Sequence, residues 1–292
     1  MRTLFIHHQT RYAYERPVSF GLHRLMIRPR DGHNMRVLDS RLAVSPQAEV
    51  HWTFDTFGNS VALLTFHKEA DELVLVSELV LRRYGLDEPM ARIERHARGY
   101  PFQYGREDSI DLGPLLTVHC EEDRATVERW ISEKIPDLPK RSLRVLDLLS
   151  TAIHESFAYS RRDAYGVQSP GETIRTASGT CRDFAYLFME AARSLGFAAR
   201  FVTGYLYDPS GDTGVGIAMT GGGATHAWAD VFIPGAGWIE FDPTNRLVAG
   251  LNLVPVATTR TPAQAVPVSG SYQRNGAGFL GMSVDVSVTQ ST

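Results

Sequence analysis

The chain has 292 residues, of which 43% are hydrophobic and 22% are charged. These proportions are typical of a soluble globular protein and exclude a disordered chain, a collagen and a coiled coil. The 30 basic and 33 acidic side chains leave a net charge of −3, so the basic excess of a nucleic-acid-binding protein is missing. At about 150 residues per domain, this length predicts two domains.

The N-terminal residues lack the apolar core of a signal peptide, and no stretch approaches the ~20 apolar residues of a membrane span. Two cysteines, Cys120 and Cys181, are too few for a disulfide framework. We therefore expect a cytoplasmic protein with free thiols and without nucleic-acid or membrane partners. In a reducing compartment an isolated cysteine can serve as a nucleophile.

Strand patterns fill the first third of the chain. Apolar residues alternate over residues 3–14, and shorter strand-like runs follow at 22–27, 37–44, 50–54, 61–65 and 73–81. The pair Gly58–Asn59 between two of these runs predicts a hairpin turn. Strands at this spacing without a helical period predict an antiparallel β domain, a sandwich or an open barrel, over residues 1–94.

The hydrophobic period then changes to that of helices. Helices are predicted around residues 127–135, 143–157 and 184–195, and strands at 198–207, 226–233 and 238–242. Helices followed by strands predict an α+β domain over residues 95–248. The tail, residues 249–292, is rich in Val, Thr, Gly and Pro and alternates near its end, so we expect it to add strands to one of the sheets.

Cys181 is predicted to begin the third of these helices. Thr180 is a good N-cap residue, and with Asp183 it forms a variant of the capping box, which makes Cys181 the first helical residue. The helix dipole, the free backbone N–H groups and Arg182 would then favour the thiolate, and the same N–H groups could stabilise an oxyanion. The alternative is a buried structural cysteine, which is the usual role of a lone cysteine.

A histidine and a carboxylate could complete a site with this cysteine. His226 lies where the glycine-rich stretch 211–225 meets a strand, a frequent position for active groups. The glycines could instead form a phosphate loop, but the Gly-Lys-Ser/Thr ending is missing. Asp242 ends the following strand, and Asp230, four residues from His226 on the same face, is a rival carboxylate. Such a trio supplies the nucleophile, base and orienting group of acyl transfer.

The register of the last two strands makes a geometric prediction. His226 and Asp242 are both even-numbered, so in an antiparallel hairpin they share a face only across an odd loop or a bulge. Pairing Phe232 with Trp238 gives an odd loop and places His226 diagonally from Asp242. We therefore expect the Asp242 carboxylate to bond one ring nitrogen of His226 and the other nitrogen to face Cys181.

Three local strings resemble motifs of the transglutaminase-like superfamily. Ser-Gly-Thr-Cys-Arg-Asp-Phe-Ala around Cys181 resembles its nucleophile segment, and Thr-His-Ala-Trp-Ala-Asp-Val-Phe around His226 resembles its histidine segment. Gly-Trp-Ile-Glu-Phe-Asp-Pro-Thr-Asn, which contains Asp242, resembles its aspartate segment. The resemblance covers residues 140–247, and the region of the Phe-Gly-Asn hairpin resembles the β domain that precedes this core in bacterial members.

The resemblance implies a papain-like α+β core in which Cys181 is the nucleophile, His226 the base and Asp242 the orienting carboxylate. Such an enzyme forms a thioester with a protein or peptide substrate. We favour hydrolysis of an amide, as by a peptidase or amidase, over cross-linking. No calcium loop of the Asp-x-Asp-x-Asp-Gly kind occurs, and we expect neither a cofactor nor a metal.

An oxyanion formed in this reaction needs hydrogen-bond donors. The backbone N–H of Cys181 is the first that we expect. The second is left open among Tyr159, Tyr165 and Gln168.

Two other classes of function stay open. The chain could be a binding module that keeps the fold without catalysis, and a covalent active-site probe would separate it from an enzyme. Cys181, His226 and Asp242 could also be metal ligands, since zinc accepts all three residue types. However, the sequence contains neither Cys-x-x-Cys nor His-Glu-x-x-His.

Overall fold

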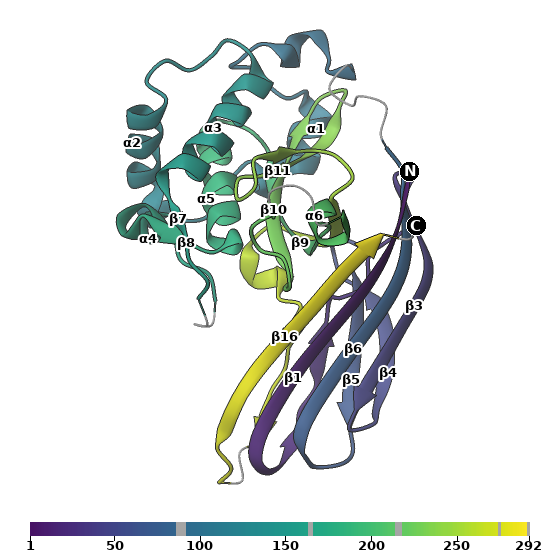
Figure 1. The fold of residues 1–292 in the computed structure, drawn as a ribbon. Coiled ribbons are helices and arrows are strands. Elements are labelled where there is room, and N and C mark those ends of the chain that lie inside the picture. Colours follow the sequence, from purple (N-terminus) through teal and green to yellow (C-terminus); the bar gives the residue numbers. More distant parts are fainter. Residues whose placement is uncertain (86–91, 163–165, 214–217, 274–275, 291–292) are drawn as a thin grey trace.

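The chain folds into two lobes, as a computed structural model shows (Figure 1). The structure describes residues 1–85, 92–162, 166–213, 218–273 and 276–290. Helices around a five-stranded sheet form the upper lobe, and two antiparallel sheets form the lower lobe. This α+β architecture, with an antiparallel β unit ahead of the helical core, confirms the predicted fold class.

Long antiparallel strands build the lower lobe. One sheet contains, in order, β16 (Phe279–Gln290), β1 (Arg2–Phe20), β6 (Ala70–Arg83) and β3 (Met35–Ser45), with β15 (Tyr272–Gln273) beside the far end of β1. The other contains β14 (Val268–Ser269), β2 (His23–Leu25), β5 (Ser60–Phe66) and β4 (Ala48–Phe54). The alternation predicted for residues 3–14 is confirmed, because Leu4, Ile6 and His8 are buried on one face. Gly58, with a φ of 72°, lies in the predicted turn between β4 and β5.

The sheet of the upper lobe is antiparallel and carries the predicted strands. Its order is β12 (Leu247–Val248), β11 (Gly237–Asp242), β10 (His226–Ile233), β9 (Ala199–Leu206) and β13 (Leu253–Thr259). A small parallel pair, β7 (Ala158–Tyr159) and β8 (Ser178–Gly179), lies beside it, next to the start of α5 (Cys181–Ser194).

All three predicted helices are present. They are α2 (Arg124–Lys134), α3 (Ser142–Ser156) and α5. Short helices that the sequence analysis missed are α1 (Arg106–Leu112), α4 (Pro170–Thr176) and α6 (Pro209–Thr213), together with the 3₁₀ turns η2 (Arg95–Arg98), η3 (Gly113–Leu115), η4 (Glu121–Asp123) and η5 (Pro262–Ala265). Helix α5 lies at the centre of this lobe, where Phe188 stacks on Phe241 of β11 at 5.4 Å between ring centroids. This packing fixes the N-terminus of α5 relative to the sheet.

The tail of the chain joins the two lobes. β13 pairs with β9 in the upper sheet, whereas β14, β15 and β16 pair with β2 and β1 below. Residues 249–292 thus supply strands to three sheets rather than to one. The division into units at residues 94/95 and 248/249 stays a prediction.

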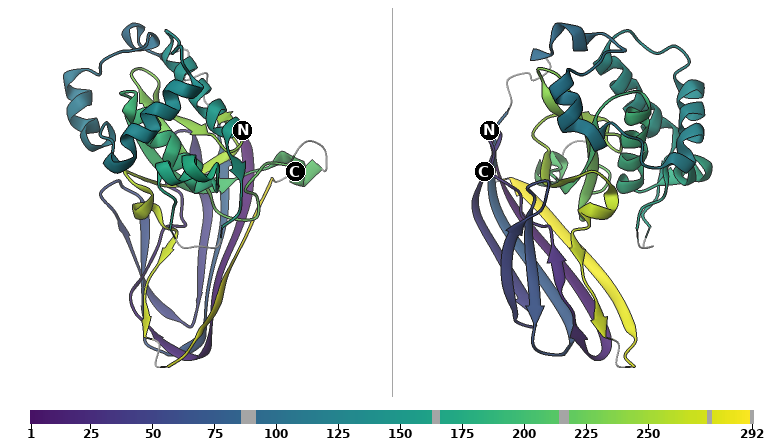
Figure 2. Two further views of the ribbon diagram at one scale, coloured as in Figure 1. Left: turned by 90° about the vertical axis from the view of Figure 1, so that its left-hand side faces the viewer. Right: turned by 180° about the vertical axis from the view of Figure 1, so that it is seen from behind.

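An apolar cluster fills the space between the lobes. It combines residues of β1, β3, β6 and β16 with residues of β13, of β9 and directly after β9. Its members are Leu4, Ile6, Met35, Leu79, Leu81, Tyr205, Tyr207, Val254, Val256 and Val286. Beside it, the Asn59 side chain bonds both backbone groups of Thr258, donating to the oxygen at 2.8 Å and accepting from the nitrogen at 2.9 Å. Figure 2 shows the lobes in contact and the two termini close together, as the pairing of Leu4 with Gln290 requires. Every helix in the described ranges is too short or too polar to span a membrane.

Candidate active site

Cys181 is the first residue of α5, as the sequence predicts. The buried carboxylate of Asp183 accepts hydrogen bonds from the Thr180 backbone nitrogen at 2.8 Å and from its hydroxyl at 2.9 Å. These bonds confirm that Thr180 and Asp183 form the N-cap of α5. The first N–H groups of a helix have no acceptor within the helix, and the N–H of Cys181, the first residue of α5, is available to a bound group.

His226 and Asp242 come together through the register of β10 and β11. Phe232 pairs with Trp238 and Ile233 with Gly237, which leaves the odd loop 234–236. The Nε2 of His226 donates to Oδ2 of Asp242 at 2.8 Å, and neither side chain is exposed to solvent. The geometric prediction of an odd loop and of this bond is confirmed.

Two further hydrogen bonds hold the Asp242 carboxylate. The Thr244 backbone nitrogen donates to Oδ1 at 2.9 Å, and Asn245 Nδ2 donates to Oδ2 at 2.9 Å. Asn245 also exchanges hydrogen bonds with the backbone of Thr220, at 2.8 and 3.1 Å, and so ties the carboxylate to the glycine-rich loop. The sequence analysis missed Asn245. The turn-forming string Asp-Pro-Thr-Asn was the available signal, since asparagine side chains commonly bond nearby backbone in turns.

Asp230, the rival carboxylate, is engaged elsewhere. Its Oδ2 accepts from Nε and Nη2 of Arg200 at 3.0 and 2.8 Å. The Arg200 guanidinium in turn lies over the Trp238 ring, 4.1 Å from its centroid. This removes the alternative in which Asp230 orients His226.

The site favours a protonated histidine. Burial lowers the pKa of His226, but the charge of Asp242, followed by that of Cys181, outweighs it and raises the pKa to about 10. For Asp242, burial raises the pKa, and the His226 charge with the hydrogen bonds from Asn245 and Thr244 brings it below its usual value. Asp242 holds Nε2, whereas Nδ1 is buried without a hydrogen-bond partner in the described chain, so Nδ1 is the ring nitrogen left to act with Cys181, whose charge also raises the His226 pKa.

A glycine and a tyrosine border the same ring nitrogen. A Cβ on Gly221, whose φ is 95°, would lie 2.9 Å from Nδ1 of His226 and 3.8 Å from the Tyr159 hydroxyl oxygen. Burial, followed by the charge of Cys181, raises the pKa of Tyr159 to about 12, so its hydroxyl keeps its proton at neutral pH. Tyr159 therefore presents a donor close to Cys181. The role of Gly221 was missed, although the run of glycines before His226 was a signal for it.

The other two expected oxyanion donors differ from Tyr159. The backbone nitrogen of Gln168 donates to Asp183 Oδ1 at 2.7 Å. With its amide nitrogen turned towards Ser178 and Asp183, the side chain donates to the Ser178 oxygen at 3.1 Å and to Asp183 Oδ2 at 3.2 Å. These bonds use both amide protons, so Gln168 supports the start of α5 instead of facing the thiol. Tyr165 lies outside the described residues.

Trp228 of the same strand and Gly204 of the neighbouring strand β9 support the histidine. The fully buried ring of Trp228 lies 6.2 Å from that of His226 at 30°. Gly204 pairs with His226 across β9 and β10, and a Cβ there would meet Trp228 Cη2 at 2.8 Å and the Val254 oxygen at 2.0 Å. Only glycine at position 204 leaves room for this indole. This requirement was not predicted from the sequence.

The second cysteine has a different environment. The Cys120 thiol is buried and donates to Asp123 Oδ2 at 3.3 Å. Burial, followed by the neighbouring Asp123, raises the pKa of Cys120 to about 12. Cys120 is therefore a poor nucleophile. The two thiols are free, without a disulfide.

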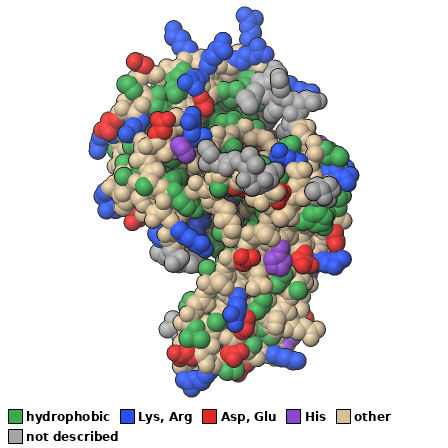
Figure 3. Space-filling model, viewed as in Figure 1, with side chains coloured by type: hydrophobic (Ala, Val, Ile, Leu, Met, Phe, Trp, Pro, Cys, Tyr) green, Lys and Arg blue, Asp and Glu red, His purple; other side chains and the backbone are tan. Residues whose placement is uncertain are grey.

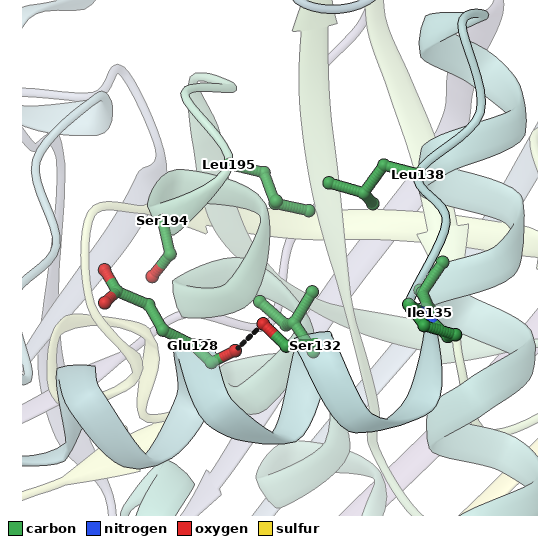
Figure 4. A pocket seen from close by; sticks show the side chains of 8 residues that line it. Glu128, Ser132, Ile135, Leu138, Ser194 and Leu195 are labelled. Atoms are coloured by element: carbon green, nitrogen blue, oxygen red, sulfur yellow. Dashed lines mark hydrogen bonds between the residues drawn. The ribbon is translucent and has the colours of Figure 1, made fainter.

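A pocket of about 300 Å³ lies away from this site (Figure 4). It is bordered by Glu128, Ser132, Ile135 and Leu138 on one side and by Ser194 and Leu195 at the end of α5 on the other. Cys181 is at the opposite end of that helix, so the pocket does not serve it. Within the described ranges, no group of three or more His, Cys, Asp or Glu is arranged to hold a metal ion.

Comparison with known proteins finds two family models that each match a part of the chain. Residues 129–243 match the family model described as the transglutaminase-like superfamily, and residues 4–82 match the bacterial transglutaminase-like N-terminal region. Residues 129–243 therefore form a transglutaminase-like core. Cys181, His226 and Asp242 all fall within the matched core, and the lower lobe contains the matched N-terminal region.

Relatives of this transglutaminase-like chain extend over nearly its whole length. An uncharacterized protein of Mycobacterium leprae is 25% identical over 295 residues, which cover 96% of both chains. One of Mycobacterium tuberculosis (strain H37Rv) is 28% identical over 297 residues, covering 96% of this chain and 90% of the relative. The fold is shared with a crystal structure from Cytophaga hutchinsonii described as a candidate cysteine protease, with a TM-score of 0.75 at 20% identity, covering 100% and 92% of the two chains.

Proposed function

We propose that this transglutaminase-like protein is an enzyme that cleaves amide bonds of a protein or peptide substrate with Cys181 as nucleophile. The observation that carries the proposal is the buried hydrogen bond between Asp242 and His226, together with the influence of the Cys181 charge, at the N-terminus of α5, on the same imidazole. A buried imidazolium beside a cysteine, held by a carboxylate, is the base and orienting pair of a cysteine nucleophile. A scaffold protein would gain nothing from such an arrangement.

In the first half of the reaction the Cys181 thiolate attacks the carbonyl carbon of the amide. The negative charge then moves to the carbonyl oxygen, where the Cys181 backbone N–H and the Tyr159 hydroxyl donate hydrogen bonds. Nδ1 of His226 gives its proton to the leaving nitrogen, the C–N bond breaks, and the amine departs. The acyl group stays on Cys181 as a thioester.

In the second half, His226 removes a proton from water as the water oxygen attacks the thioester carbonyl. The C–S bond breaks, which releases the carboxylic acid and restores the thiolate–imidazolium pair. Asp242 holds Nε2 throughout, so that Nδ1 remains the nitrogen that exchanges protons. A primary amine in place of water would give cross-linking. We favour water, in line with the description that the Cytophaga hutchinsonii protein carries.

A library of peptide amides tests this function, with released amine and carboxylate measured by mass spectrometry in the presence and absence of excess cadaverine. We expect hydrolysis that Cys181→Ala abolishes and Cys120→Ala leaves intact. Incorporation of cadaverine in place of hydrolysis would show a transamidase. Activity that survives in Cys181→Ala, or a Cys181 that no thiol-directed probe modifies, would contradict the proposal and favour a binding module.

The cytoplasmic location and the absence of nucleic-acid, membrane and cofactor partners stay predictions.

A further inference from the structure

Strand β16 has one free edge. It pairs with β1 along its other edge, from Gln290 opposite Leu4 down to Phe279 opposite Tyr14, and no strand of the described chain pairs with it on the outer side. In Figure 1 this strand runs along the near side of the lower lobe, beneath the upper lobe. Figure 3, seen from the same side, shows that the molecule narrows where the two lobes meet.

The hydrogen bonds of β16 show which backbone groups point outward. The Val286 nitrogen donates to the Gly223 oxygen at 3.2 Å, and the Gln290 nitrogen donates to Asp212 Oδ2 at 2.9 Å, so both face away from β1. Along an antiparallel strand every second residue points its N–H and C=O to the same side. The backbone groups of Val284 and Met282 therefore also point outward. In the described chain no hydrogen-bond partner meets them.

The sequence of β16 leaves this edge unprotected. Natural proteins blunt exposed edges with charges, lysine, proline or bulges. The edge strand β3 has Arg36, Asp39 and Arg41, whereas the twelve residues of β16 include Asp285 as their single charge and no lysine or proline, and its register shift lies at its start, before Met282. Met282 is 55% exposed next to the half-buried Val284. Such an edge favours pairing with another extended chain.

The free edge begins beside the candidate active site. Val286 contacts Gly223, and Gly221, two residues earlier in the same loop, borders Nδ1 of His226. Two residues of chain span less than about 8 Å. A polypeptide lying along Met282 and Val284 would thus lead towards the loop that borders His226.

We propose that the edge of β16 at Met282 and Val284 binds an extended segment of the polypeptide substrate as an added strand. This inference rests on the proposed function and specifies its substrate class as an unfolded or extended polypeptide. Backbone pairing gives affinity without a strict sequence requirement, and the exposed apolar side chain of Met282 favours apolar residues at alternate substrate positions.

Binding of a defined peptide tests this directly. The probe is a fluorescein-labelled decapeptide of alternating valine and threonine with a lysine at each end, and fluorescence anisotropy measures its Kd for the Cys181→Ala protein. We expect binding that weakens about tenfold when Val284→Pro removes one outward N–H and disturbs the edge. Met282→Lys, at an exposed position that does not threaten folding, should weaken it similarly. Methylation of alternate peptide nitrogens along one edge should do the same.

Phe5→Lys is the matched control, because Phe5 is also an exposed apolar residue of this sheet but lies on its other face. It should leave the Kd unchanged. Failure of the probe to bind, or equal binding by the Met282→Lys and Phe5→Lys proteins, would overturn the inference.

The outcomes separate this inference from the proposed function. With Cys181 present, alkylation of the thiol should be as fast in Met282→Lys as in the parent protein. A parent protein whose Cys181 does not react would contradict the proposed function alone. A dimer in sedimentation that Met282→Lys converts to a monomer would show that a second copy of the chain occupies the edge, and would contradict the inference alone.

Discussion

His226 decides the electrostatics of the candidate site. It is buried without solvent contact, which by itself would favour the neutral ring, yet Asp242 on one side and Cys181 on the other raise its pKa to about 10. At neutral pH the ring therefore carries a proton between two groups that stabilise its charge. The same proton is the one that a departing amine requires.

This environment predicts that the two thiols differ in reactivity. Cys181 should react with iodoacetamide faster than Cys120 below pH 7, because Cys181 lies beside the imidazolium while burial and Asp123 raise the pKa of Cys120 to about 12. Mass spectrometry of partially labelled protein measures the ratio. Equal labelling, or preference for Cys120, would mean that Cys181 is not activated.

Replacement of the orienting carboxylate should change the pH dependence of that reaction. In Asp242→Asn the largest influence that raises the His226 pKa is lost, and burial then lowers it, so the imidazolium disappears at a lower pH. We expect the alkylation rate of Cys181 at pH 6–7 to fall about tenfold or more. Asp230→Asn, which removes a buried carboxylate bonded to Arg200, is the control and should leave the profile in place.

The sign of the stability effect follows from the same two groups. A raised His226 pKa stabilises the fold below about pH 6.5, and this contribution is lost as pH rises towards 10. The lowered pKa of Asp242 stabilises the fold at pH values above the pKa that this carboxyl has in the unfolded chain. This contribution is lost as the pH falls through the lower pKa of the folded protein. Asp242→Asn should therefore reduce the pH dependence of stability in both ranges.

In the alkylation experiment, a pH profile of Cys181 labelling that stays unchanged in Asp242→Asn would show that Asp242 does not raise the pKa of His226.

Among the elements, those with a long periodic pattern could be predicted. Helices α2, α3 and α5 each present several apolar residues at helical spacing, and β1 alternates over more than ten residues. The helices α1, α4 and α6 have seven residues or fewer, which is too short to show a helical period. Their positions depend on packing against other elements.

The residues of the candidate site also differ in whether the sequence could predict them. Cys181, His226 and Asp242 could be found because a capping pattern and strand parity act locally. Asn245 and Gly221 could not, since their roles depend on where the glycine-rich loop lies relative to β11. Gly204 matters only because Trp228 and Val254 approach it from two other strands. Contacts of this kind arise between segments far apart in the sequence.

A comparison of helices α2 and α5 should separate stability from activity. Trp130 of α2 is 4% exposed and stacks on Phe157 at 5.5 Å, so Trp130→Ala should lower the free energy of unfolding by ~3–5 kcal/mol. Cys181→Ala removes a single sulfur atom at a helix terminus and should leave folding nearly unchanged while it abolishes activity. Urea denaturation compares the two variants. A larger loss of stability in Cys181→Ala would indicate a structural cysteine.

In the whole molecule the lobes are joined by buried contacts. The apolar cluster around Leu4, Tyr205 and Val254 spans them, and the fully buried Asn59 links the β4–β5 turn to β13. The lower lobe therefore holds the edge of the upper sheet and, through Val286, the loop beside His226.

Asn59→Ala tests this connection. It leaves both backbone groups of Thr258 without their partner, which should cost about 1–3 kcal/mol for each buried group that stays unpaired. The midpoint of urea unfolding should fall accordingly, while Gln47→Ala, at an exposed turn of the same lobe, should not shift it. An Asn59→Ala protein as stable as the parent would show that this contact does not hold the lobes together.

The covalent intermediate provides the most direct test of the central claim that Cys181 is an acyl-transfer nucleophile. A peptide substrate or an activated ester is mixed with the enzyme, the reaction is quenched with acid within the first turnover, and peptide mapping by mass spectrometry locates the added acyl group. We predict one acyl group in thioester linkage on Cys181, absent from Cys181→Ala and lost on treatment with hydroxylamine. Turnover without any adduct on Cys181, or an acyl group carried by another residue, would contradict it.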